Sequence, residues 1–142
     1  MKKALTLAQK AAKQGEVPIG AVLVYKNELI ASGYNKKEQW KTPLGHAELI
    51  CLHRASQKLG NWRLIDCTLY STLEPCVMCS GALVQARVGR LVFGASDPKG
   101  GGSTSLYKIP QDERLNHRLE VCGGVLADEC GKILSDFFRS RR

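Results

Sequence analysis

The sequence predicts an α/β protein, a three-layer α/β/α sandwich around a five-stranded mixed sheet. Two observations lead to this fold class. Apolar runs of strand length alternate with helix-length segments along most of the chain, which is typical of a sheet covered by helices. The first two strands are separated only by a short polar turn, so they form an antiparallel hairpin and the sheet cannot be wholly parallel. With 142 residues, 44% hydrophobic and 24% charged, we expect residues 1–142 to form a single domain.

The first half of the chain contains a helix, a hairpin and a loop. Residues 2–14 are rich in Ala, Lys, Leu and Gln, which favour a helix. The near-continuous apolar run at 18–25 is typical of a strand buried on both faces. A polar turn at 26–28 leads into a second strand at 29–33. The polar segment 35–45 is expected to be a loop.

The second half alternates helices and strands. Apolar residues at helical spacing predict a helix over 46–59, and Gly60 ends it. A strand follows at 66–72. A second helix is expected to run from Pro75, placed in the first turn, to about residue 87. The remaining predicted elements are a strand at 90–94, a Gly- and Ser-rich loop at 97–106, an irregular or briefly helical segment at 107–115, a short strand at 119–122 and a closing helix at 125–139.

Charge and cysteine content bear on partners and compartment. The formal net charge of +8 suits a polyanion such as nucleic acid, although many small proteins are basic for solubility alone. No apolar run approaches the roughly 20 residues of a membrane span. The basic start at 1–5 is not followed by the apolar region of a signal peptide, and the six cysteines are expected to be reduced thiols. These features predict a cytoplasmic protein.

Two short motifs carry the chemistry of the sequence. His46-Ala47-Glu48 and Pro75-Cys76-Val77-Met78-Cys79 each fall where a loop enters a helix. Cys76 and Cys79 are three residues apart, so they share one helix face and can bind one metal ion together. One imidazole and two thiolates are a ligand set that zinc accepts, and three protein ligands leave the fourth position open for catalysis. The motifs therefore predict a catalytic zinc site on His46, Cys76 and Cys79.

Glu48 is expected to act as a proton carrier in this site. Zinc with two thiolates and a neutral imidazole carries no formal charge and acidifies water weakly, so a base is needed nearby. As a fourth ligand, Glu48 would instead close the site. A lone C-x-x-C pair also occurs in structural zinc ribbons and redox proteins, but a ribbon needs a second pair and a redox pair a thioredoxin-like context. The combination of H-x-E with P-C-x-x-C is far more specific and is typical of zinc nucleobase deaminases.

At these residues the sequence resembles the cytidine deaminase-like superfamily and, within it, the bacterial tRNA-specific adenosine deaminases. The resemblance covers nearly the whole chain. Besides the two motifs, it rests on the segments 16–22, 33–35, 72–82, 93–95, 115–118 and 126–142. The segment Leu134-Ser135-Asp136-Phe137-Phe138-Arg139 is especially informative, because deaminases of free nucleosides generally lack it.

The resemblance implies a reaction and a set of partners. The reaction is the hydrolytic deamination of adenosine to inosine at the wobble position of a tRNA anticodon. One zinc ion per subunit would be held by His46, Cys76 and Cys79, and Glu48 would transfer protons from water to the ring and to the departing amine. Family members are homodimers, with the active site completed near the subunit interface.

The resemblance also implies which residues contact the RNA. Asn35 matches the position that hydrogen-bonds the purine edge, and Ala47 and Asp97 are further expected contacts. Of the adjacent Phe137 and Phe138, one is expected in the core, and Phe138 is the candidate for stacking on an unstacked base. Arg139, Arg141 and Arg142 are expected near phosphates. The alternative for this segment is a frayed basic terminus.

Two other functions remain open at the level of sequence. A deaminase of a small substrate, such as guanine or a cytosine nucleotide, would use the same fold and the same zinc site, but would gain nothing from a long cationic surface. A non-catalytic RNA-binding subunit would keep the fold, but such subunits typically lose the glutamate, and Glu48 is present.

Overall fold

A five-stranded mixed sheet forms the centre of the protein, which is described here over residues 1–142 by a computed structural model. The strand order is β2-β1-β3-β4-β5. β1 lies antiparallel to β2 and β3, whereas β3, β4 and β5 run parallel. The predicted hairpin and mixed sheet are therefore confirmed. The strands are β1 (Gly20–Tyr25), β2 (Glu28–Tyr34), β3 (Cys67–Leu73), β4 (Arg90–Ala95) and β5 (Glu120–Cys122).

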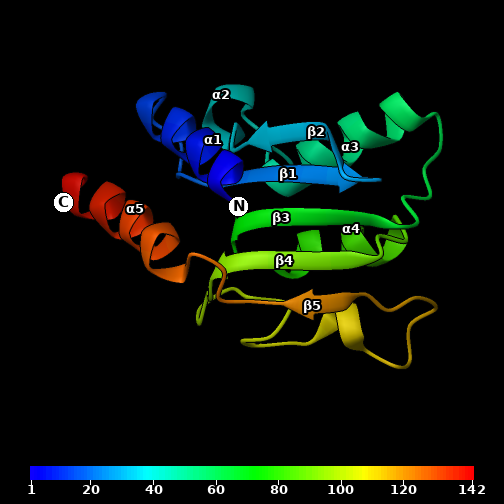
Figure 1. The fold of residues 1–142 in the computed structure, drawn as a ribbon. Coiled ribbons are helices and arrows are strands. Elements are labelled where there is room, and N and C mark those ends of the chain that lie inside the picture. The colour runs from blue at the N-terminus through cyan, green and yellow to red at the C-terminus, as the bar shows by residue number, and fades with distance from the viewer.

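Helices cover both faces of this sheet, as predicted. Figure 1 shows α1 in front of the sheet near the start of β1, α5 beside the ends of β3 and β4, and α3 and α4 behind the sheet. None of the helices combines the length and the apolar character that a membrane span requires. The helices are α1 (Lys2–Lys13), α2 (Lys37–Trp40), α3 (Ala47–Leu59), α4 (Val77–Gln85), the short 3₁₀ helix η1 (Ile109–Gln111) and α5 (Ala127–Ser140).

The sheet and the helices enclose one core of 16 buried residues. Leu23, Leu69 and Leu91 of three neighbouring strands are fully buried in it, and each such side chain contributes about 1.5–3 kcal/mol of transfer free energy. α1 approaches β1 closely, because a Cβ atom at Gly20 would collide with the backbone of Ala4. This contact lies just where β1 begins, two residues later than the apolar run predicts.

Two further features differ from the sequence prediction. The expected loop at 35–45 contains the single-turn helix α2, because the buried carboxylate of Glu16 accepts hydrogen bonds from the N–H groups of Glu38 and Gln39. This contact comes from a distant segment, so local sequence does not reveal it. The predicted helix start at Pro75 is wrong as well: Cys76 is extended, with φ −70° and ψ 179°, and α4 begins at Val77.

The termini of four strands lie together at one end of the sheet. Gly20 at the start of β1 pairs with Tyr34 at the end of β2, and Leu73 pairs with Ala95 at the ends of β3 and β4. The segments that adjoin these strand termini therefore meet at the same end of the sheet. In α/β proteins, ligands bind at the carboxyl ends of the parallel strands, which here are the ends of β3 and β4. The opposite end of the sheet carries the β1–β2 turn, where Lys26 and Asn27 both have positive φ as a type I′ turn requires.

Candidate active site at two helix N-termini

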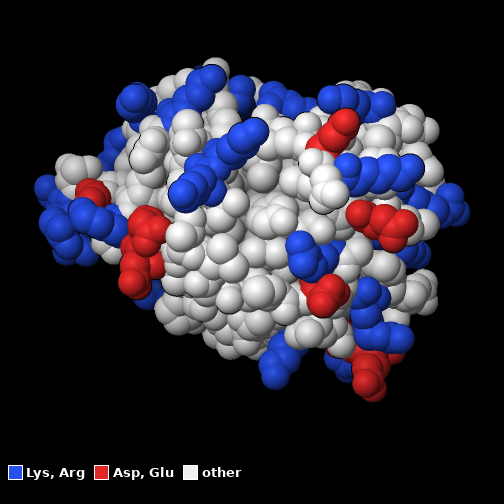
Figure 2. All heavy atoms as spheres, in the orientation of Figure 1, with Lys and Arg blue, Asp and Glu red and all other residues white.

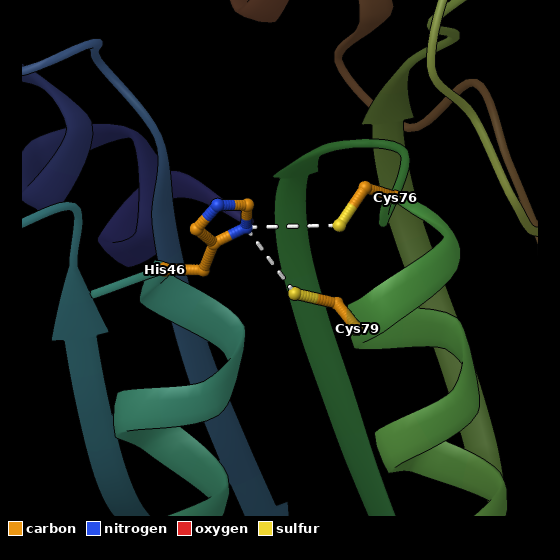
Figure 3. A group of neighbouring side chains, drawn as sticks. All are labelled: His46, Cys76 and Cys79. Carbon is orange, nitrogen blue, oxygen red and sulfur yellow. Dashed lines mark hydrogen bonds between the residues drawn. The ribbon is translucent and has the colours of Figure 1, made fainter. Parts of the chain in front are cut away.

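Three candidate metal ligands converge at the first turns of α3 and α4. His46 directly precedes α3, Cys76 directly precedes α4, and Cys79 lies in the first turn of α4. Figure 3 shows the imidazole of His46 between the two helix starts, pointing toward both thiols. The Nδ1 atom of His46 lies 3.7 Å from the Sγ atom of Cys76 and 3.4 Å from that of Cys79.

These separations fit a tetrahedral zinc ion. Zinc bonds of about 2.0–2.1 Å to nitrogen and about 2.3 Å to sulfur, at tetrahedral angles, place the two ligand atoms about 3.6 Å apart. The two N–S distances in the protein lie on either side of this value, and all three ligand atoms lie within 4.8 Å of one another. The three side chains can therefore hold zinc with little movement, through Nδ1 of the histidine.

The two thiols differ in their electrostatics, and the thiol of Cys76 is the one already disposed to bind metal. The hydrogen bond from the Cys79 thiol, followed by contact with His46, lowers the pKa of Cys76 to about 4, whereas the same bond and burial raise the pKa of Cys79. One thiolate, that of Cys76, is thus already present at neutral pH and accepts a hydrogen bond from the Cys79 thiol. The N-terminal end of α4, with its positive partial charge, adds to the stabilisation of negative charge on both sulfurs.

Glu48 lies in the first turn of α3 with only 3% of its surface exposed. Its Oε1 atom is buried and has no hydrogen-bond partner in the protein. A buried acceptor without a partner costs about 1–3 kcal/mol of stability. A contribution to stability therefore does not account for a glutamate at this position. Burial also raises the pKa of this carboxyl to about 7. A carboxyl that exchanges its proton near neutral pH is suited to general acid–base catalysis.

The structure brings two of the predicted substrate contacts together. The Oδ1 atom of Asn35 accepts a hydrogen bond of 2.9 Å from the N–H of Ala47, the first residue of α3. Asn35 is 6% exposed, and this bond satisfies one of the free N–H groups at the helix start. With its oxygen engaged in this way, the amide group of Asn35 has its two N–H donors left for a ligand.

Two adjoining hollows lie at the end of the sheet where the termini of β1 to β4 gather. The larger, of about 900 Å³, is lined by two of the expected substrate contacts, Asp97 and Phe138, together with Leu73. The smaller, of about 350 Å³, contains Asn35. Arg141 lines both hollows. The metal-ligand candidates line neither, but the larger hollow reaches Leu73 near the end of β3, and the smaller one reaches Asn35, which is bonded to the start of α3.

The C-terminal arginines are not equivalent. Arg139 does not line either hollow, and its guanidinium lies 3.5 Å from Asp136 on the exposed surface of α5. Arg141 lies 4.5 Å from the ring of Phe137, measured from the guanidinium carbon to the ring centre. The sequence points to Phe138 and the basic segment but does not distinguish its arginines. It also gives no indication of the apolar lining residues Val17 and Leu73, which look like ordinary core positions.

The other histidines lie outside the candidate site. The Nε2 atom of His117 lies 2.7 Å from the carbonyl oxygen of Val88, where it ties the chain before β5 to the turn before β4. His53 is exposed on α3. The cluster of His46, Cys76 and Cys79 is the one group of three metal-binding side chains in the protein, in agreement with the sequence motifs.

Comparison with known proteins agrees with this geometry. The family model of the MafB19-like deaminases matches residues 1–142. The tRNA-specific adenosine deaminase of Bacillus subtilis is 53% identical over 142 residues, which is all of this chain and 88% of the relative. A solved structure from studies of A-to-I editing by tRNA:A34 deaminases has a TM-score of 0.91 and 40% identity, over 94% of this chain and 97% of that one.

A more distant solved structure, a guanine deaminase from Nitrosomonas europaea, has a TM-score of 0.82 and 23% identity, over 96% of this chain and 81% of that one, and shows the shared fold alone. The motifs, the site and the full-length relatives agree with one another. The chain is a deaminase, and it belongs to the family of the tRNA-specific adenosine deaminases.

Proposed function

We propose that this protein catalyses the zinc-dependent hydrolytic deamination of adenosine to inosine at the wobble position, residue 34, of a tRNA anticodon, with release of ammonia. The observation that carries the proposal is Glu48, a buried carboxylate with an unpaired oxygen beside three zinc-ligand candidates. The full-length similarity to tRNA-specific adenosine deaminases supports the choice of substrate.

His46, Cys76 and Cys79 are the proposed zinc ligands. When bound, zinc supplies the Lewis acidity that lets water act as a nucleophile at neutral pH. The chain itself supplies the proton transfers. Glu48 accepts a proton as water attacks C6 of adenine and gives it to the ring nitrogen. It then takes the remaining proton of the added hydroxyl group and gives it to the amino group as the C–N bond breaks. Adenosine and water are thus converted to inosine and ammonia without a net gain or loss of protons.

The target adenine must leave its stack before it can reach this buried carboxyl. We propose that the N–H donors of Asn35 hold the purine, and that the bond from the N–H of Ala47, which is itself fully buried, fixes the Asn35 amide in place. The neighbouring nucleotides would lie in the larger hollow. There, Phe138 offers an exposed ring for stacking and Asp97 offers acceptor oxygens.

Positive charge surrounds the proposed RNA-binding region. Figure 2 shows Lys and Arg gathered at the C-terminal end of α5 and again over α1. α1 carries lysines with no acidic residue among its twelve positions. This charge suits the phosphates on either side of an anticodon loop.

The two arginines of the C-terminal segment allow a direct comparison. We expect Arg141→Ala to weaken the binding of an anticodon stem-loop at every ionic strength and to reduce its salt slope by about 1, because one phosphate contact is lost. Arg139→Ala should have a much smaller effect, since that side chain pairs with Asp136 outside both hollows. Fluorescence anisotropy across a salt series measures both variants. Equal losses for the two arginines would contradict this placement of the RNA.

We propose further that the active form is a homodimer. Four apolar side chains are exposed beside the metal-ligand candidates: Val77, Met78, Leu106 and Tyr107, of which Tyr107 is 58% exposed. Their two segments are joined through Gly102, which packs tightly against Val77. Contiguous exposed apolar surface of this kind marks an interaction site, and a second copy of the same chain is the partner that the family suggests.

Leu106→Asp tests this interface. A charge buried between two subunits is strongly unfavourable, so we expect the dimer dissociation constant to rise at least about 100-fold. Analytical ultracentrifugation over a dilution series gives that constant. Leu29→Asp is the control, because Leu29 is an exposed leucine on the distant β1–β2 hairpin. A monomeric wild-type protein at micromolar concentration would refute the dimer.

The substrate is tested with anticodon stem-loops that carry A or C at the wobble position, alongside free adenosine, cytidine and guanine. We expect inosine from the A-containing stem-loop alone, detected by nuclease digestion and mass spectrometry. Turnover of guanine or cytidine with an inert stem-loop would support a small-substrate deaminase in place of the tRNA enzyme. A tRNA substrate would also place the protein in the cytoplasm, where its six free cysteines stay reduced.

A further inference from the structure

A second buried carboxylate, Glu74, lies next to the metal-ligand motif. It follows the last residue of β3 and is only 1% exposed. No lysine or arginine pairs with it; five hydrogen-bond donors of one loop surround it instead. Oε1 accepts from the N–H of Asp97 at 3.1 Å and from the hydroxyl of Ser105 at 2.5 Å, and Oε2 accepts from the N–H groups of Ser103, Thr104 and Ser105 at 3.1, 2.8 and 2.9 Å.

The loop is folded around this carboxylate. Three successive backbone N–H groups point at one oxygen, an arrangement that binds anions in many proteins. Gly101 lies so close that a Cβ atom there would collide with the carboxylate. Without Glu74, the N–H groups of residues 103–105 would lose their acceptor, and that of Ser103 would be left in a fully buried position, which folded proteins avoid. The conformation of residues 97–105 therefore depends on a side chain that is not part of the loop.

The same loop touches both parts of the active site. Toward the metal ligands, Gly101 forms a β-bridge with Cys76, and the N–H of Gly102 donates to the carbonyl oxygen of Pro75 at 2.9 Å. The hydroxyl groups of Ser80 and Ser103 lie 2.8 Å apart. Toward the RNA, the start of the loop supplies Asp97 to the wall of the larger hollow.

We propose that Glu74 is a positioning residue for the deamination. Its carboxylate fixes the 97–105 loop and thereby holds the Asp97 wall of the RNA groove at a set position relative to Cys76 and Cys79. The inference rests on the proposed function for its catalytic consequence, although the contacts of the loop do not depend on the substrate. A glutamine at position 74 has nearly the same shape, but it has one acceptor oxygen in place of two and its NH₂ group would face N–H donors.

The test is Glu74→Gln, with Asp112→Asn as the matched control. Asp112→Asn also removes one negative charge, but the carboxylate of Asp112 is hydrogen-bonded only to Arg114. In Glu74→Gln we expect amide exchange at residues 103–105 to become about 100-fold faster, because charge-assisted bonds to a buried group are lost. Exchange in β1 and β3 and one zinc per subunit should be retained.

The kinetic readout separates positioning from general damage. We expect the KM for the stem-loop to rise about tenfold in Glu74→Gln, while kcat per zinc-loaded subunit changes less than about threefold, because the groove wall is displaced and Glu48 is not. A variant that is merely less stable would lose active protein at unchanged KM. Asp112→Asn should match the wild type in exchange, zinc content and KM.

Ser105→Ala keeps the test decisive if the glutamine variant fails to fold. It removes one bond to Glu74 at the far end of the loop from the cysteines, so we expect a smaller change in the same direction for exchange and KM. Unchanged exchange at 103–105, or a loss of zinc in parallel with the change in exchange, would overturn the positioning role. A wild-type protein that is inert toward every stem-loop would contradict the proposed function instead, since the exchange measurement needs no substrate.

Discussion

Glu48→Gln is expected to lower kcat/KM for the anticodon stem-loop by about 10⁴-fold or more while leaving zinc bound. General acid–base groups typically contribute about 10²–10⁴-fold, and here one carboxyl is proposed to act first as base and then as acid. Glutamine has nearly the same size but cannot accept or release the proton. Single-turnover measurement of inosine, with metal analysis of the same sample, gives both quantities.

The stability of this variant provides a second check. The Oε1 atom of Glu48 is a buried hydrogen-bond acceptor without a partner, on a side chain that can carry a negative charge. Replacing the carboxyl group by a neutral amide is therefore expected to raise the free energy of unfolding by about 1 kcal/mol. Glu28→Gln is the control: Glu28 is exposed at the β1–β2 turn, and both activity and stability should be unchanged. Residual activity above about 10% in Glu48→Gln would remove Glu48 from the mechanism.

Cys79→Ser is expected to abolish both metal binding and activity. Loss of a residue that only supports a metal ligand costs about 10–100-fold in affinity, and removal of a thiolate ligand should exceed that range. Cys79 is fully buried with its sulfur 3.4 Å from Nδ1 of His46, so a serine hydroxyl at this position neither reaches nor attracts zinc as well. Competition with a chromophoric chelator measures the affinity.

The other cysteines supply controls for that experiment. Cys122 is exposed and Cys67 is buried away from the metal-ligand cluster. Cys122→Ser should bind zinc as tightly as the wild type and remain active. Cys67→Ser should bind zinc equally well, although the hydroxyl in the core lowers stability. If Cys79→Ser retained one zinc per subunit and full activity, the proposed ligand set would be wrong.

Much of the fold follows from local sequence because its signals are local. The type I′ turn at Lys26 and Asn27, the glycine that ends α3 at Gly60, and the alternation of apolar strands with helices all act within a few residues. The convergence of His46 with Cys76 and Cys79 also follows, because both motifs sit at helix starts and a ligand set of this type has few other uses.

The features that escaped prediction depend on contacts between distant segments. α2 exists because Glu16 caps it, and the 97–105 loop takes its shape from Glu74. Neither carboxylate belongs to a recognisable short motif for that role. The difference between Arg139 and Arg141 depends on the rotation of the last turn of α5. Sequence spacing gives the residues of such a segment but not the direction in which each one points.

Because four strand ends gather at one end of the sheet, the candidate site and the two hollows lie there, and the opposite end carries neither. The turn at Lys26 and Asn27 and the helix end at Gly60, where an added Cβ would meet open space, both lie at this opposite end. Loop length has only a weak effect on chain entropy, so insertions at these positions cost little stability. Evolution and protein engineering can therefore lengthen or fuse the chain at this end while the geometry of catalysis stays unchanged.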